Sequence, residues 1–163
     1  MKTLIVSAYM LVGLVLGAQA QSISKNALGL RLGSNDGFGA EISYQRALKS
    51  DKRLEFDLGW RDSKDVSAVK LVGLHQWVWN IDKGFNWYAG AGGGLGTWNY
   101  NAYGVKNSGT FLFASGDIGI EYNFDFPLQL SLDYRPEIYV HYDGYRDGNF
   151  GSDLALSARY KFN

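Results

Sequence analysis

Apolar and polar residues alternate along most of the chain, with the period of two that is typical of β-strands. Past residue 21, no stretch shows the spacing of apolar residues at i, i+3, i+4 and i+7 that an amphipathic helix needs. Eight strands without helices between them predict an antiparallel up-and-down meander. The eight alternating runs cover approximately residues 27–33, 38–45, 53–60, 66–81, 85–98, 112–123, 128–135 and 154–162.

The fourth run, 66–81, does not keep a single parity. Val69, Leu71, Trp77 and Trp79 fall on one face, whereas Val72, Leu74 and Val78 fall on the other. A β-bulge near Gly73 would place all of these apolar residues on the same side of the sheet. We therefore predict a bulge at that position.

The connections between runs differ at the two ends of the meander. Tight turns are predicted at residues 49–51, 82–84 and 125–127, after the second, fourth and sixth strands. At the other end, 34–37 and 62–65 are short, and Asn99–Gly109 and His141–Gly151 are longer. Short turns at one end and longer loops at the other are typical of a meander that spans a membrane.

The two faces of the predicted strands differ in charge. In the seven runs of clear parity, one face carries every charged residue: Arg31, Glu41, Arg53, Glu55, Asp57, Asp117, Glu121, Asp133, Arg135, Arg159 and Lys161. The opposite face is apolar and ends in aromatic residues. Those near the tight turns are Trp77, Trp79, Phe85, Trp87, Tyr122, Phe124, Tyr160 and Phe162, and those near the loops are Phe38, Trp60, Trp98, Phe111, Phe113 and Tyr139. Two aromatic belts match the two interfaces of a bilayer, so the apolar face is expected to point toward lipid.

These observations predict an all-β fold: a closed, eight-stranded, antiparallel up-and-down transmembrane β-barrel. Only a closed barrel pairs every backbone group of its strands in lipid. A soluble barrel of the lipocalin type, with its apolar face inside, is the alternative.

An eight-stranded barrel is just wide enough for side chains to fill its interior. The five bases and six acids of the charged face are therefore expected to pair into an ion network that plugs the lumen, with a narrow ion path as the alternative. Glycines 90, 92, 94 and 96 are expected to make room for lumenal side chains.

The first 20 residues have the features of a secretory signal peptide. Lys2 precedes an apolar run that is too short to span a bilayer as a helix, and Ala18-Gln19-Ala20 provides a cleavage site. We therefore divide the chain into a signal peptide, 1–20, and an outer-membrane β-barrel domain, 21–163, exported through the Sec route.

The signal peptide, the eight alternating runs and the last strand together resemble the small OmpA/OmpX-like eight-stranded outer-membrane barrels of diderm bacteria, over residues 25–163. The last run, with Leu154, Leu156, Ala158, Tyr160 and Phe162 at alternate positions, looks like the terminal strand signal that the barrel-assembly machinery reads. Asn163 follows the aromatic residue on which family members commonly end. The resemblance implies a place in the outer membrane, contact with membrane lipids and lipopolysaccharide, and insertion by the barrel-assembly machinery.

Composition excludes several classes of function. Sixteen basic and 16 acidic residues balance, whereas nucleic-acid-binding proteins usually carry a basic surplus. The absence of cysteine excludes a disulfide scaffold and a cysteine nucleophile. The glycine run at 90–96 lacks the Lys-Ser or Lys-Thr and the following helix of a phosphate-binding loop. We expect no cofactor and no metal site, since a calcium loop at Asp143, Asp147 and Asp153 would lack the EF-hand spacing.

The candidates for catalysis are few. His75 lies in the middle of a predicted strand, where we expect it to be buried near lumenal acids. His141 and Ser152 flank the last loop, and some outer-membrane barrels that modify lipid A use a histidine and a serine near the outer rim. No motif around either residue resembles those enzymes, so we expect no catalytic residues. A lipid A-modifying enzyme is kept as an alternative, which requires His141 and Ser152 to be within hydrogen-bond distance.

The two longer loops are the remaining candidates for function. They are rich in tyrosine, asparagine and glycine, as adaptable binding surfaces are. The candidate contact residues are Tyr100, Tyr103, Tyr142, Tyr145 and Arg146. The alternative is that these residues only cap the barrel rim and meet lipopolysaccharide. We thus predict a structural or interaction role in the envelope, either through these loops or as an accessory subunit of a larger outer-membrane complex.

Overall fold

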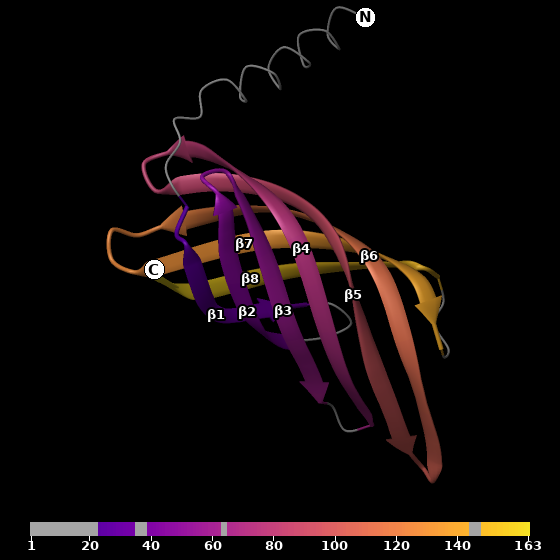
Figure 1. The fold of residues 1–163 in the computed structure, drawn as a ribbon. Helices are drawn as coiled ribbons and strands as arrows, with labels where there is room; N and C mark the ends of the chain where they lie inside the picture. The colour runs from indigo at the N-terminus through magenta and orange to yellow at the C-terminus, as the bar shows by residue number, and fades with distance from the viewer. Residues whose placement is uncertain (1–22, 35–38, 63–64, 144–147) are drawn as a thin grey trace, which may run out of the picture.

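The computed structural model describes residues 23–34, 39–62, 65–143 and 148–163. Within these residues, eight antiparallel strands follow one another around a closed barrel, and the first strand pairs with the last (Figure 1). The strands are β1 (Asn26–Gly33), β2 (Gly39–Lys49), β3 (Lys52–Asp62), β4 (Val66–Asp82), β5 (Phe85–Ala102), β6 (Val105–Asn123), β7 (Leu128–Tyr142) and β8 (Phe150–Phe162). The predicted fold is confirmed, whereas the predicted signal peptide, 1–20, lies outside the described residues. In the described part of the chain, no helix is long and apolar enough to cross a membrane.

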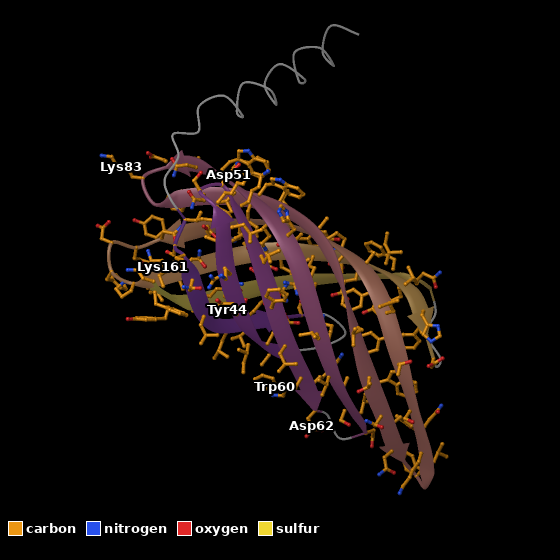
Figure 2. All side chains as sticks on the ribbon, in the orientation of Figure 1. Tyr44, Asp51, Trp60, Asp62, Lys83 and Lys161 are labelled. Carbon is orange, nitrogen blue, oxygen red and sulfur yellow. The ribbon has the colours of Figure 1, made fainter. Side chains whose placement is uncertain are left out.

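The barrel has its apolar side chains outside and its charged side chains inside. Leu30 is 52% exposed and Leu156 is 64% exposed, whereas Arg31 and Arg159 are fully buried. Side chains that cover the outer surface, including Tyr44 and Trp60, are visible in Figure 2. This arrangement is the one that a lipid-embedded barrel requires and is the reverse of a lipocalin. The structure therefore does not support the soluble-carrier alternative.

Strand β4 has one parity from Val66 to Asn80 and does not contain the predicted bulge. It pairs without a register shift across Gly73, with Phe56 of β3 on one side and Gly93 of β5 on the other. Val72, Leu74 and Val78 consequently point into the lumen. The prediction was wrong because it assumed that every apolar residue faces lipid, whereas part of this lumen is apolar.

The predicted loop Asn99–Gly109 is a continuation of two strands. β5 and β6 stay paired as far as Ala102 and Val105, and only Tyr103 and Gly104 form the turn. Both turn residues have a positive φ, 50° and 79°, as in the type I′ turns that close two-residue hairpins. β6 is therefore 19 residues long against 8 in β1, and the β5–β6 hairpin projects beyond the other strands (Figure 1). This segment has polar residues on both faces, so it lacks the alternation of apolar and polar residues from which strands were predicted.

One of the two predicted aromatic belts is present and the other is largely wrong. At the tight-turn end, outward rings pack in pairs, such as Trp79 on Trp87 with centroids 4.3 Å apart. At the loop end Trp60 does point outward, 47% exposed. The other described aromatics of that belt, Trp98, Phe111, Phe113 and Tyr139, instead gather inside the barrel with Val72 and Leu74. Phe38 lies outside the described residues.

A register shift in β7 adds one more ring to this interior group. Phe113 pairs with Tyr139 and Leu112 pairs with His141, so that Val140 is an extra residue on the β7 side. Such a bulge reverses the parity of the residues that follow it. Tyr142, which simple alternation would turn outward, consequently contacts the interior aromatic cluster.

Candidate functional site

The middle of the lumen is crossed by hydrogen-bonded ion pairs. Arg31 of β1 donates to Glu41 of β2 at 2.9 Å, to Asp153 of β8 at 2.6 Å and to Asp133 of β7. Arg135 of β7 reaches across the lumen in the other direction. Its guanidinium contacts Asp57 at 2.6 Å, Glu55 at 3.2 Å and Glu41 at 3.4 Å. Because Glu41 is shared by both arginines, the pairs form one continuous network.

The network continues toward the tight-turn end of the barrel. Arg53 of β3 contacts Glu121 of β6 at 2.7 Å and lies over the ring of Tyr88 at 4.8 Å. Gln76 of β4 accepts a hydrogen bond from Arg53 at 2.6 Å. Glu121 accepts further bonds from Asn86, Asn123 and Gln129.

Arg159 of β8 completes the middle layer. It donates to Ser43 at 2.9 Å and to Ser131 at 2.8 Å, and it lies 3.3 Å from Glu55. Every strand of the barrel contributes to these layers, because the side chains that alternate inward from all eight strands converge on one axis. The structure thus brings together ten of the eleven charged residues assigned to the lumen from the sequence.

The eleventh residue, Lys161, lies apart from the ion network. Its Nζ donates to the backbone carbonyl of Phe124 at 2.8 Å, at the tight-turn rim (Figure 2 labels its position). Three charges of the ion network were missed from the sequence. Lys70 lies in the strand of ambiguous parity, and Glu137 and Asp153 lie just beyond the runs assigned to β7 and β8. Glu137 is two residues after Arg135 on the same face of β7, so a longer predicted strand would have assigned it to the lumen.

The missed residues change the charge of the lumen. Eight carboxylates are buried, against four guanidinium groups and the partly buried ammonium of Lys70. Arg31 and Arg135 are each shared by three acids, and Lys70 is shared by two. Lys70 lies 3.0 Å from Glu137 and 3.4 Å from Glu41, and its Nζ is 5.7 Å from the ring centroid of Phe113.

The lumen is not filled at the loop end. It contains an open cavity of about 1020 Å³, which we call the mouth cavity. The expectation that side chains plug the whole lumen is therefore correct for the middle and wrong for this end. The physical reason is that β1 to β3 are short and carry Gly33, Gly39, Ala40 and Gly59 at this level, so one side of the barrel has few bulky side chains.

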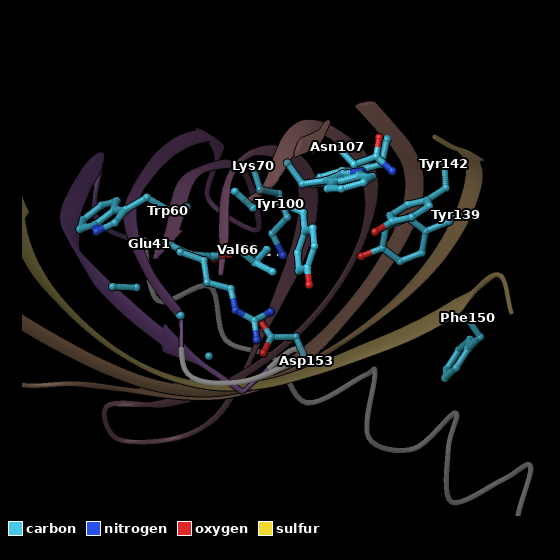
Figure 3. A pocket seen from close by; sticks show the side chains of 18 of the residues that line it. Glu41, Trp60, Val66, Lys70, Tyr100, Asn107, Tyr139, Tyr142, Phe150 and Asp153 are labelled. Atoms are coloured by element: carbon cyan, nitrogen blue, oxygen red, sulfur yellow. Dashed lines mark ion pairs between the residues drawn. The ribbon is translucent and has the colours of Figure 1, made fainter. Parts of the chain in front are cut away.

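The opposite wall of the mouth cavity is aromatic. Its residues are Trp98, Tyr100, Phe111, Tyr139 and Tyr142, from β5, β6 and β7. Figure 3 labels Tyr100, Tyr139 and Tyr142. Glycines on the lumenal side of β5 make this wall possible: a Cβ at Gly96 would lie 2.3 Å from the ring of Phe111, and one at Gly94 would lie 2.5 Å from that of Phe113. The predicted role of these glycines, to make room for lumenal side chains, agrees with these distances.

Asp143 fastens the projecting hairpin to the end of β7. Its backbone N–H donates to the carbonyl of Thr110 at 2.9 Å, and its carbonyl accepts from the indole Nε1 of Trp98 at 2.8 Å. Its carboxylate accepts from the Thr110 hydroxyl at 2.8 Å. These hydrogen bonds from Thr110 lower the pKa of the exposed Asp143 carboxyl below its ordinary value. Three hydrogen bonds thus connect the hairpin to the end of β7 at the rim of the mouth cavity.

Solved structures with the same architecture are found at low sequence identity. Neisserial surface protein A is 17% identical, with a TM-score of 0.64 over 84% of this chain and 94% of that one. The N-terminal β-barrel domain of Pseudomonas aeruginosa OprF is 13% identical, with a TM-score of 0.62 over 84% and 98%. Ail, the attachment invasion locus protein of Yersinia pestis, is 15% identical, with a TM-score of 0.56 over 85% and 97%. The chain has the fold of the small, OmpA/OmpX-like outer-membrane barrels. No protein-family model matches the sequence, and no curated protein matches it.

Within this outer-membrane barrel fold, the candidate catalytic residues are far apart. Ser152 pairs with Pro136, five residues along β7 from His141, which corresponds to roughly 15 Å. His141 instead contacts Asp143 at 3.2 Å, with both side chains more than half exposed. His75 was expected in the lumen and in fact points outward, because β4 has no bulge; its ring packs against Trp77 with centroids 4.5 Å apart.

The candidate calcium residues are also separated. Asp143 binds Thr110 at the rim and Asp153 binds Arg31 inside the lumen, while Asp147 lies outside the described residues. Among the described residues, no group of three or more His, Asp or Glu side chains is placed to hold a metal ion.

The structure separates the candidate contact residues of the loops. Tyr100 and Tyr142 line the mouth cavity, and Tyr103 is fully exposed at the tip of the hairpin. Tyr145 and Arg146 lie outside the described residues. The terminal-strand residues Leu156, Ala158, Tyr160 and Phe162 all lie on the outer face of β8.

Proposed function

We propose that this protein is an integral β-barrel of the bacterial outer membrane that does not conduct ions and that presents a binding surface at its loop end. The observation that carries the proposal is the ion network across the lumen. Arg31 and Arg135 are fully buried, and each contacts acids on more than one strand. An eight-stranded barrel with such a cross-section has no continuous aqueous path of the kind that porins contain.

The two ends of the barrel support a role at the loop end. The tight-turn end consists of short turns, such as Ser50-Asp51 and Lys83-Gly84, above a belt of outward rings. The loop end has the projecting β5–β6 hairpin and the mouth cavity. In outer-membrane barrels the longer connections are extracellular and the short turns are periplasmic. The names of two structural neighbours, a surface protein and an attachment invasion locus protein, agree with a role on the cell surface.

The outer wall and the last strand support insertion into the outer membrane. The leucines that face outward would contact acyl chains, and the aromatic belt would contact the headgroup zone of lipids. The outward side of β8, with Leu156, Ala158, Tyr160 and Phe162, is the part that the barrel-assembly machinery would read.

Cysteine labelling tests the location and the orientation. The natural chain has no cysteine, so single variants can be labelled without background. Tyr103→Cys, at the hairpin tip, should react with a membrane-impermeant maleimide in intact cells. Lys83→Cys, in a tight turn, should react only after the outer membrane is permeabilised. Labelling of Lys83→Cys alone in intact cells would contradict the proposed orientation.

Conductance measurements test the closed lumen. The full chain, refolded and inserted into a planar lipid bilayer, should give no stepwise ion conductance under applied voltage. Insertion is verified separately by protease protection of the reconstituted barrel. Regular current steps from inserted wild-type protein would show a pore and would end the proposal of a purely surface-directed role.

A further inference from the structure

The mouth cavity has three kinds of lining, each on a different side. One wall consists of aromatic side chains, the facing wall is largely glycine and alanine with Arg61 near the open end, and the floor is charged. The floor residues are Glu41, Lys70 and Asp153 (Figure 3). The volume, about 1020 Å³, is at the upper end of the range of roughly 300–1,000 Å³ for small-molecule sites. The cavity is therefore large enough for a ligand of more than one ring.

The aromatic wall is held in place by its own contacts. The phenol of Tyr139 donates to Glu137 at 2.8 Å, and the indole of Trp98 is fixed by the carbonyl of Asp143. The rings of Trp98 and Tyr142 are inclined by only 10° to one another, with centroids 6.2 Å apart. Tyr100 points into the cavity from the hairpin (Figure 3). Rings held in this way offer flat apolar faces at little cost in conformational entropy.

The floor is polar, and its charged groups are already paired. The Lys70 ammonium is shared between Glu41 and Glu137, and Asp153 is paired with Arg31. A ligand with a net charge would gain no unpaired partner there. An acyl chain would cover these polar groups without hydrogen-bonding them, which is costly. A ligand with many neutral hydroxyl groups avoids both penalties, because a hydroxyl both donates to carboxylates and accepts from ammonium and guanidinium groups.

We propose that the mouth cavity binds a neutral oligosaccharide. The C–H faces of its sugar rings would lie against Tyr100, Trp98 and Tyr142, since the faces of aromatic rings are electron-rich and attract polarised C–H groups. Its hydroxyls would point to Glu41, Lys70 and Asp153. The facing wall of glycine and alanine leaves space for the rings to enter edge-on. The inference rests on the proposed function only in that the cavity must open to the outside of the cell.

Calorimetric titration of the full chain with maltotriose, cellotriose and chitotriose tests this inference. The barrel is refolded in a detergent without a sugar headgroup, because a maltoside would compete for the cavity. At least one neutral trisaccharide should bind saturably, and trigalacturonate, which carries three carboxylates, should bind more weakly. Competition by the polysaccharide of smooth lipopolysaccharide, and not by a core-only form, would identify the cell's own surface as the source of the sugar.

Paired tyrosine variants locate the binding site. Tyr100→Ala should weaken binding about tenfold or more, equivalent to about 1.4 kcal/mol. Tyr103→Ala, three residues away at the exposed tip of the same hairpin, should leave the affinity unchanged. Tyr100→Phe keeps the ring and should bind better than Tyr100→Ala, which separates lost stacking from a damaged fold.

Three results would overturn the inference: no heat from any neutral trisaccharide with folded protein, equal affinities for Tyr100→Ala and Tyr103→Ala, or preferential binding of trigalacturonate. None of them bears on the conductance or labelling results, so the closed surface-directed barrel can hold while the ligand assignment fails. Conversely, saturable binding by a barrel that conducts ions would leave the ligand assignment intact.

Discussion

Arg31 and Asp133 are joined across the lumen, although their strands do not pair. The Nε of Arg31 in β1 lies 3.0 Å from Oδ1 of Asp133 in β7, and β8 lies between these two strands in the sheet. Backbone hydrogen bonds connect only neighbouring strands, so this ion pair supplies a contact that the sheet cannot make. Both side chains are almost completely buried, and the guanidinium is planar and suited to binding several carboxylates.

Substitution of Arg31 should therefore destabilise the barrel strongly. Arg31→Met removes the cation that Asp133, Glu41 and Asp153 share, and loss of one partner from a buried ion pair typically costs about 3–5 kcal/mol. Urea unfolding of the refolded barrel, followed by tryptophan fluorescence, measures the loss. Arg46→Met is the matched control, because Arg46 is exposed and should change stability by less than about 1 kcal/mol. Equal unfolding midpoints for the two variants would show that the network contributes nothing to stability.

The sequence was sufficient to predict the fold and most of the ion network. Arg31 lies between two leucines, and in a lipid-embedded strand the leucines face lipid, so the charged side chain must face the lumen. It was less informative for the mouth cavity. Phe111 and Phe113 flank Leu112, so local polarity does not distinguish the two faces. Phe111 and Phe113 have the same parity as the lumenal Asp117, and extending that parity along the strand would have assigned both rings to the lumen.

Other features of the site had no local signal in the sequence. Tyr142 faces inward only because of the bulge at Val140, which depends on pairing with β6. The cavity itself depends on short strands on one side of the barrel and long strands on the other. Asp143 contacts Trp98 across 45 residues, a distance at which no alternation pattern carries information.

The lipid-facing surface makes a depth-dependent prediction. Leu156 is the middle residue of β8 and is 64% exposed, whereas Leu48 is near the turn end of β2 and is 51% exposed. Leu156→Arg should cost about 2–4 kcal/mol in a bilayer, and Leu48→Arg no more than about 1 kcal/mol. Reversible folding into lipid vesicles measures both values. If the two arginines cost the same, the middle of β8 is not at the centre of the hydrocarbon layer.

Gly96 is predicted to be intolerant of any side chain. A Cβ there would lie 2.3 Å from the Phe111 ring and 2.4 Å from the backbone carbonyl of Val69. Because the carbonyl cannot move without disturbing the sheet, Gly96→Ala should destabilise the barrel by about 1–3 kcal/mol. Gly39→Ala is the control, since a Cβ at Gly39 has no atom within 4 Å. A similar melting temperature for both variants in circular dichroism would mean that the aromatic wall can shift to accommodate a methyl group.

The contact between Asp143 and Thr110 predicts a pH dependence at the rim. Hydrogen bonds from Thr110 lower the pKa of Asp143, so the carboxylate form is favoured when the hairpin is fastened. By linkage, the stabilisation of the rim is fully present above the ordinary carboxylate pKa and is lost as the pH falls through the lowered one. In Thr110→Val the hydroxyl donor is gone, and the pKa of Asp143 should rise toward its ordinary value. Carboxyl-detected NMR titration of both proteins measures this shift.

Hydrogen exchange of the Trp98 indole N–H provides a second measurement of the same contact. This group donates to the carbonyl of Asp143, so it should exchange faster once Asp143 is protonated and the rim loosens. Thr110→Val should exchange quickly already at neutral pH, whereas Thr110→Ser, which keeps the hydroxyl, should behave like the natural protein. Identical exchange in all three proteins across the titration would show that the indole is held by the wall of the mouth cavity alone, independently of the Asp143 side chain.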